Sequence, residues 1–167
     1  MIMNAVQDAM NDQINKEMFS AYVYLSMSAH FAAANLPGFA HWMRAQANEE
    51  VAHAMKLFDF VNERGGRVML KAIEGPPVEF KSALAIFESA YGHEQKVTAM
   101  INGLYEVALK EKDYPAQIML QWFISEQVEE EKNAGDIVQQ LKMVGDDSRA
   151  LLMLDRELGG RAAEGEE

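Results

Sequence analysis

The sequence predicts an all-α protein: a four-helix bundle with a long crossover between its second and third helices and a short fifth helix at the C-terminal end. Apolar residues recur at intervals of three and four over four long segments, which is the spacing of one helix face. Strand-like alternation is not sustained anywhere in the chain. One connection is much longer than the others, and this restricts how the helices can pack.

The ends of these helices follow from turn and capping chemistry. Pro37 and Gly38 interrupt the chain between the first two segments, and Gly65 with Gly66 ends the second. Pro115 suits the first turn of the fourth helix, because proline has no N–H to lose there. We expect the helices at about residues 4–33, 39–64 and 82–111, from near 115 through 141, and at 147–158.

The connections predict the topology. Only a few residues join the first helix to the second and the third to the fourth, so each pair should be antiparallel. The stretch GGRVMLKAIEGPPVEFK between the second and third helices is longer. A helix of about 26 residues measures about 39 Å, and about fifteen extended residues reach about 50 Å. This linker can therefore cross the whole bundle. We expect one domain over residues 1–158 and a flexible tail over 159–167.

Composition and charge exclude several classes of function. The chain has 167 residues, a formal net charge of −11 and no cysteine. The charge argues against a nucleic acid or an anionic membrane as partner. The lack of cysteine excludes disulfides, thiolate metal sites and cysteine nucleophiles. The first residues lack the pattern of a secretion signal, and no apolar run approaches the roughly 18 residues of a membrane span. A cytoplasmic location is expected.

Polar residues interrupt the apolar stripe near the middle of each long helix. They are Glu17 in the first helix, Glu50 and His53 in the second, Glu94 in the third, and Gln127 and Glu130 in the fourth. Each of the first three has a counterpart 77 positions later (17 and 94, 50 and 127, 53 and 130). The two halves therefore look like an internal duplication related by a pseudo-twofold axis. Such symmetry would bring the interruptions together as one four-cornered site.

Carboxylates gathered in a bundle core require cations to balance them. Two like charges about 4 Å apart repel by about 4 kcal/mol at an effective dielectric constant of about 20, and burial adds a desolvation cost. Glutamate and histidine three residues apart lie on one helix face and can hold one ion. Oxygen ligands with one imidazole suit a first-row transition metal better than calcium or magnesium. Iron(II) is favoured, with manganese and zinc as alternatives.

This pattern resembles that of the bacterial non-haem ferritins, whose bundles bind two irons. The resemblance covers essentially residues 1–158 and rests on Glu17, Tyr24, Glu50-x-x-His53, Glu94 and Gln127-x-x-Glu130. It implies that the first iron is bound by Glu17, Glu50 and His53. It further implies that Glu94 and Glu130 bind the second iron and that Glu50 bridges the two.

The resemblance also implies roles for residues around these two irons. Gln127 would orient bound oxygen species or water. Tyr24 and Trp122 would be neighbours able to hydrogen-bond or to donate electrons. A nearby third iron site would use Glu49, Glu126, Glu129 and Glu130.

The function implied is that of an iron-storage ferritin. Such a protein oxidises Fe(II) with O2 or H2O2 at a di-iron centre within each subunit and deposits ferric mineral inside a homo-oligomeric 24-subunit shell. Ala52 stands where bacterioferritins carry their haem-binding methionine, so no haem is expected.

Two alternative functions are open at this stage. One is a di-iron oxygen-activating enzyme acting on an organic substrate. The short chain argues against it, as does Gln127-x-x-Glu130 in place of a second Glu-x-x-His motif. The other is a structural bundle without metal, which would leave the repulsion between the carboxylates unexplained.

Overall fold

The computed structural model describes residues 1–161, and within that range it consists of four long helices and a short fifth. The helices are α1 (Asn4–Ala33), α2 (Pro37–Glu63), α3 (Ala83–Lys110), α4 (Tyr114–Val144) and α5 (Ser148–Leu158). They confirm the expected all-α bundle. None of the helices over this range is both long and apolar enough to cross a membrane.

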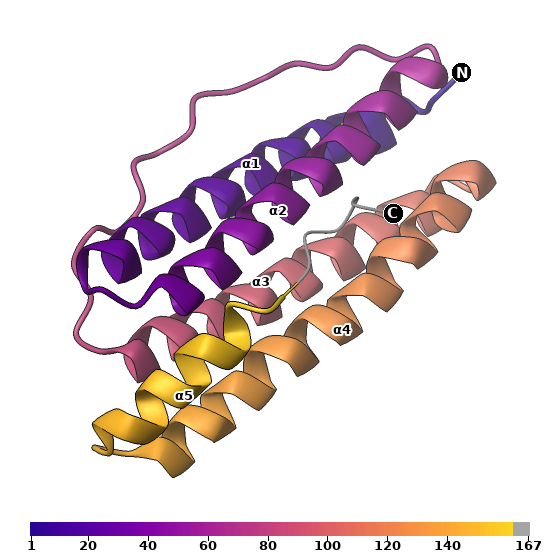
Figure 1. Ribbon diagram of the computed structural model, residues 1–167. Helices are drawn as coiled ribbons and strands as arrows, with labels where there is room; N and C mark the ends of the chain where they lie inside the picture. The colour runs from indigo at the N-terminus through magenta and orange to yellow at the C-terminus, as the bar shows by residue number, and fades with distance from the viewer. Residues whose placement is uncertain (162–167) are drawn as a thin grey trace.

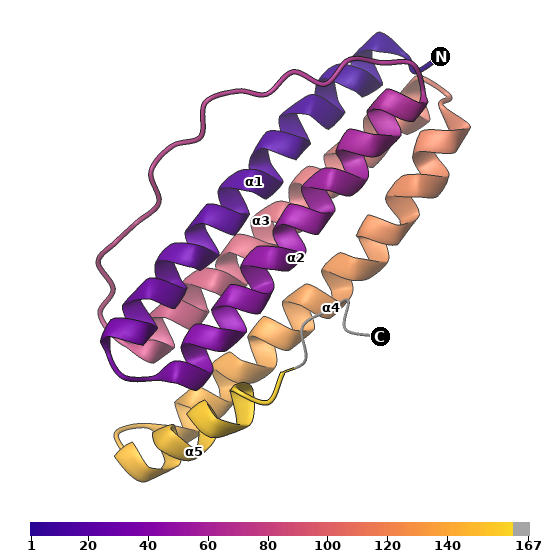
Figure 2. The same ribbon diagram turned by 45° about the horizontal axis from the view of Figure 1, so that its top comes forward.

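Two antiparallel helix pairs form the bundle, α1 with α2 and α3 with α4 (Figures 1 and 2). The segment 64–82 connects the pairs and runs along the outside of α1 from one end of the bundle to the other (Figure 1). The Asn11 side chain accepts a hydrogen bond from the Met69 N–H (2.9 Å), and Ser26 donates to the Pro77 carbonyl (2.5 Å). The long linker is thus the crossover that the sequence predicts.

Three helices begin at a residue whose side chain accepts hydrogen bonds from the first turn. Ser82 and Asp113 each accept from the N–H three residues on, at 3.1 and 3.2 Å, and Asp147 caps α5 in the same way. These bonds satisfy N–H groups that the helix itself leaves unpaired. Asp113 also binds the Arg64 guanidinium at 2.9 and 3.2 Å. Because Arg64 follows α2 and Asp113 precedes α4, this ion pair joins the two helix pairs at one end.

The core consists of two apolar clusters with a polar layer between them. One cluster contains the rings of Phe31, Phe39 and Phe87, which pack in tilted and edge-on arrangements with centroids 5.0–5.9 Å apart. The other, toward the opposite end of the bundle, includes Leu57 and Ile101. Burying each such side chain contributes about 1.5–3 kcal/mol to folding. The clusters therefore hold the helices in register on both sides of the polar layer.

The fifth helix packs across the beginning of α2 (Figure 2). Asp155 accepts a hydrogen bond from the Phe39 N–H at 2.9 Å, which places a carboxylate at the positive end of α2. At this crossing a Cβ added to Gly38 would lie 1.6 Å from the main-chain oxygen of Asp155. Only glycine allows the two backbones to approach so closely.

Replacing Gly38 with alanine should displace α5 from α2. Hydrogen–deuterium exchange over residues 148–158 should then rise, whereas the amides of α1 and α3 keep their protection. Gly92→Ala is the matched control, since a Cβ at this helical glycine meets nothing within 4 Å. It should be neutral or stabilise α3 by up to about 1 kcal/mol. Unchanged exchange in α5 of the Gly38→Ala protein would contradict the close packing.

Candidate metal centre

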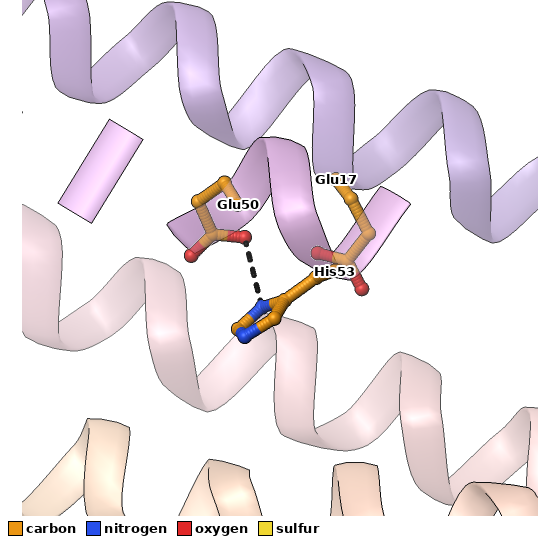
Figure 3. A group of neighbouring side chains, drawn as sticks. All are labelled: Glu17, Glu50 and His53. Atoms are coloured by element: carbon orange, nitrogen blue, oxygen red, sulfur yellow. Dashed lines mark ion pairs between the residues drawn. The ribbon is translucent and has the colours of Figure 1, made fainter. Parts of the chain in front are cut away.

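Glu17 of α1 meets Glu50 and His53 of α2 in the polar layer (Figure 3). One ligand atom from each lies within 4.8 Å of the others, and all three side chains are buried. Glu50 Oε2 lies 3.7 Å from His53 Nδ1, because residues three apart share one face of the helix. Two oxygens and one imidazole nitrogen thus converge on a space where one metal ion can bind.

Two carboxylate oxygens in this group lack a hydrogen-bond partner among the described residues. Glu17 Oε2 and Glu50 Oε2 are buried and accept no hydrogen bond within residues 1–161. An unsatisfied buried acceptor costs about 1–3 kcal/mol, and more if it is charged. Burial raises the pKa of Glu17 to about 7. Burial and the neighbouring charge of Glu17 raise the pKa of Glu50 well above its ordinary value. Protons or a bound cation must therefore balance these groups.

His53 offers a neutral ligand nitrogen. Burial, with the nearby charge of Lys56, lowers the pKa of His53 to about 4. A neutral imidazole is the form that binds metal ions. The ring lies edge-on to Trp122, at 5.5 Å between centroids, and the Lys56 ammonium lies 3.8 Å from the Trp122 ring centroid. Trp122 is 38% exposed, so it contacts both His53 and solvent.

Glu94 of α3 lies between two uncharged donors. The Tyr24 hydroxyl donates to one oxygen of Glu94, and the Gln127 amide donates to the other at 3.2 Å. Burial and the nearby charges of Glu94 and Glu50 raise the pKa of Tyr24 well above its ordinary value, so the hydroxyl keeps its proton. Burial also raises the pKa of Glu94. Both oxygens of this carboxyl therefore have fixed directions.

Glutamine amides orient three of the site's carboxyl groups. The pairs are Gln13 to Glu17 (2.8 Å), Gln46 to Glu130 (2.6 Å) and Gln127 to Glu94 (3.2 Å). Burial, with the charge of Glu94 as the next cause, raises the pKa of Glu130 to about 8. A neutral amide fixes a carboxylate without cancelling its charge, so the site keeps its attraction for cations.

The residues expected around a third iron lie in different surroundings. Glu126 and Glu130 of α4 place ligand atoms within 4.8 Å of His53. Glu49 is buried and forms an ion pair with Arg161 at 2.5 Å. Glu129 is exposed on α4 and belongs to neither group of possible ligands found within residues 1–161. The third site therefore stays a prediction.

Sequence reasoning missed several residues that touch the site. Gln13 precedes its partner Glu17 by four residues, one helix turn, and that spacing was a usable signal, whereas Gln46 binds Glu130 on another helix. Thr98 accepts a hydrogen bond from Gln127 at 3.3 Å. Arg161 lies beyond the last apolar stripe, within the predicted flexible tail, and no sequence pattern singles it out. Of that tail, residues 159–161 are seen and 162–167 lie outside the described residues, so its flexibility stays a prediction.

A family model described as a ferritin-like domain matches residues 7–144. The chain belongs to the ferritin family. The bacterial non-heme ferritin of Staphylococcus haemolyticus (strain JCSC1435) is 39% identical over 162 residues, covering 97% of this chain and 98% of that protein. Its counterpart in Staphylococcus aureus (strain USA300) is 37% identical over 161 residues, covering 96% and 97%. The resemblance noted from the sequence is confirmed.

Solved ferritin structures also match this one closely. A "novel open pore ferritin" from the hyperthermophilic archaeon Archaeoglobus fulgidus is 53% identical, with a TM-score of 0.95 over 96% of this chain and 98% of that one. A closed form of that ferritin, engineered by site-directed mutagenesis, gives a TM-score of 0.96 at 52% identity, over 97% and 99%. Fold and family therefore agree over nearly the whole length of this ferritin-family chain.

The metal-free protein should lose stability as the pH rises from about 6.5 to 8.5. Glu17 and Glu130 have pKa values of about 7 and about 8 in the folded chain, against an ordinary value of 4.5. The folded state therefore binds more protons than the unfolded state in this range, and stability falls as they leave. The pKa values of His53 and His93, lowered from 6.5 to about 4, act with the opposite sign below this range.

Thermal midpoints measured in a chelator across this pH range test the prediction. Glu130→Gln removes one titrating group and keeps the shape of the side chain, so its midpoint should depend less on pH. Equal slopes for Glu130→Gln and the parent would contradict the assignment.

Proposed function

We propose that this iron-storage protein of the ferritin family oxidises iron(II) at a two-iron centre within each chain. The resulting iron(III) then collects as a ferric mineral inside a 24-subunit shell of identical chains. One observation carries the proposal: Glu17 and Glu50 each have a buried carboxylate oxygen that accepts no hydrogen bond from the described part of the chain, and both residues bring a ligand atom within 4.8 Å of a ring nitrogen of His53. Membership in the ferritin family supports it.

Iron(II) is the substrate of the reaction. Glu17, Glu50 and His53 bind the first ion, Glu94 and Glu130 bind the second, and Glu50 bridges them. Iron replaces the protons that otherwise balance these buried carboxyls, so binding releases protons. Each iron(II) loses one electron, and dioxygen or peroxide takes up the pair. The anionic ligands favour the product, because iron(III) carries the larger positive charge.

The surrounding residues position the reactants. Tyr24 and Gln127 hold the two oxygens of Glu94 with neutral donors, and Gln127 also orients the oxygen species or water beside the ions. Trp122, in contact with both His53 and solvent, and Tyr24 are the neighbours able to donate electrons. A third iron bound by Glu49, Glu126, Glu129 and Glu130, the lack of haem and a cytoplasmic location belong to the same proposal.

Aerobic loading with some hundreds of iron(II) ions per chain tests storage directly. Size-exclusion chromatography with protein and iron detected together should show both in one particle of several hundred kilodaltons, as 24 chains of 18.7 kDa require. At most two irons per chain on a monomer or dimer would instead favour a di-iron enzyme acting on an organic substrate.

Removing a ligand should slow oxidation without changing assembly. Glu50→Ala and Glu94→Ala each delete a carboxylate of the centre, and we expect the initial rate of iron(II) oxidation to fall at least about tenfold, the equivalent of about 1.4 kcal/mol. Stopped-flow absorbance of iron(III) measures this rate. Glu106→Ala, which removes an exposed carboxylate from α3, is the control and should match the parent. Parental rates in the Glu50 and Glu94 variants would disprove the site assignment.

A further inference from the structure

The chain beyond α5 returns to the middle of α2 and places a guanidinium beside the polar layer. Arg161 Nη2 donates to Glu49 Oε2 at 2.5 Å, and Nη1 donates to Gln46 Oε1 at 2.9 Å. Glu49 itself is only 6% exposed. Gln46, which accepts from the same guanidinium, donates to Glu130 at 2.6 Å. Glu49 is therefore linked to a predicted ligand of the metal centre through Arg161 and Gln46.

Arg161 is fixed by more than its ion pair. The guanidinium carbon lies 4.7 Å from the centroid of the Trp42 ring, a stacking distance at which the ring attracts a cation. A His41 ring nitrogen is 2.8 Å from the Arg161 carbonyl oxygen, and a proton on that nitrogen makes it the donor. The side chain is 22% exposed. The guanidinium of Arg161 thus contacts an aromatic ring, a carboxylate and a side-chain amide. Its backbone carbonyl lies beside the ring of His41.

The donor to Glu49 differs in charge from the other donors of the site. Glutamine amides and a tyrosine hydroxyl orient Glu17, Glu94 and Glu130 and leave their negative charge in place. Glu49 instead receives a guanidinium, whose positive charge offsets the negative charge of the carboxylate. A metal ion arriving at Glu49 must therefore displace a charge that is already bound there.

We propose that Arg161 is a built-in counter-cation that competes with iron for Glu49, so that iron reaches this carboxylate only when residues 159–161, here called the C-terminal segment, leave α2. The inference rests on the proposed function and adds to it a condition on when iron can bind Glu49, at the edge of the centre. Gln46 connects Arg161 with Glu130. Its side-chain oxygen accepts from Arg161, and its nitrogen donates to Glu130 at 2.6 Å. Docking of the C-terminal segment thereby also orients Glu130.

Zinc binding to the full-length chain tests this competition without any redox step. Crystals of the parent and of Arg161→Gln, soaked at equal zinc concentrations, should differ in anomalous density at one place. We expect zinc on Glu17, Glu50 and His53 in both proteins, and additional zinc on Glu49 only in Arg161→Gln. Isothermal titration should show one further ion per chain in the variant, with an affinity at least about tenfold above that of the parent at this position.

Arg156→Gln is the matched control. It removes the same charge from α5, but Arg156 is exposed and has no ion pair within residues 1–161. This variant should bind zinc as the parent does. An equal gain of zinc in both variants would overturn the inference, because net charge alone would then explain the effect.

The remaining outcomes separate this inference from the proposed function. Equal occupancy at Glu49 in all three proteins, with zinc bound by Glu17, Glu50 and His53, overturns the inference and leaves the function standing. Absence of zinc from Glu17, Glu50 and His53 in all three overturns the proposed function and the inference together.

Discussion

The structure depends on balancing negative charge in the middle of a helix bundle. Four glutamates from four helices lie in the polar layer, each at most 5% exposed. Without cations they are held by protons, by amide donors and by one tyrosine hydroxyl. The pKa values of these four glutamates are raised because burial disfavours the ionised carboxylates. A bundle that keeps this layer gives up apolar packing in its centre, and the two flanking clusters must supply the stability.

The choice of donors explains how the site can be rigid and still attract cations. A lysine or arginine beside each carboxylate would orient it equally well, but it would also cancel the local field. A glutamine amide orients the carboxylate without cancelling its negative charge. His53 follows the same logic, because a neutral ring binds metal whereas a protonated one repels it. At the edge of this region, Arg161 instead places a positive charge on an acid, Glu49.

Much of the fold and of the centre could be predicted because the signals are local or repeated. Turn residues such as Pro37 mark the helix ends, and the offset of 77 pairs Glu17 with Glu94 by position in the chain alone. The surroundings of the outer acids could not be predicted in the same way. Glu126 and Glu129 flank the apolar stripe of α4 equally well by spacing, and only side-chain packing puts the first near His53 and leaves the second exposed.

The contact of Arg161 was beyond sequence reasoning for a different reason. It depends on the direction in which α5 leaves α4, and that direction depends on the close approach of Gly38 to Asp155. No sequence pattern links Gly38 with Asp155, since the two residues lie far apart in the sequence. Tertiary packing at one glycine thus helps to place residues 159–161.

The long crossover along α1 has a geometric consequence for the depth of the site. Because it returns the chain to the starting end of α2, the helices α2 and α3 run parallel, and α1 runs parallel to α4 (Figure 1). Two helical hairpins so arranged are related by an axis perpendicular to the bundle. Such an axis exchanges the two ends of the bundle. Residues that it relates therefore lie at the same position along the bundle only at its middle. The topology therefore places the polar layer as far as possible from the solvent at both ends.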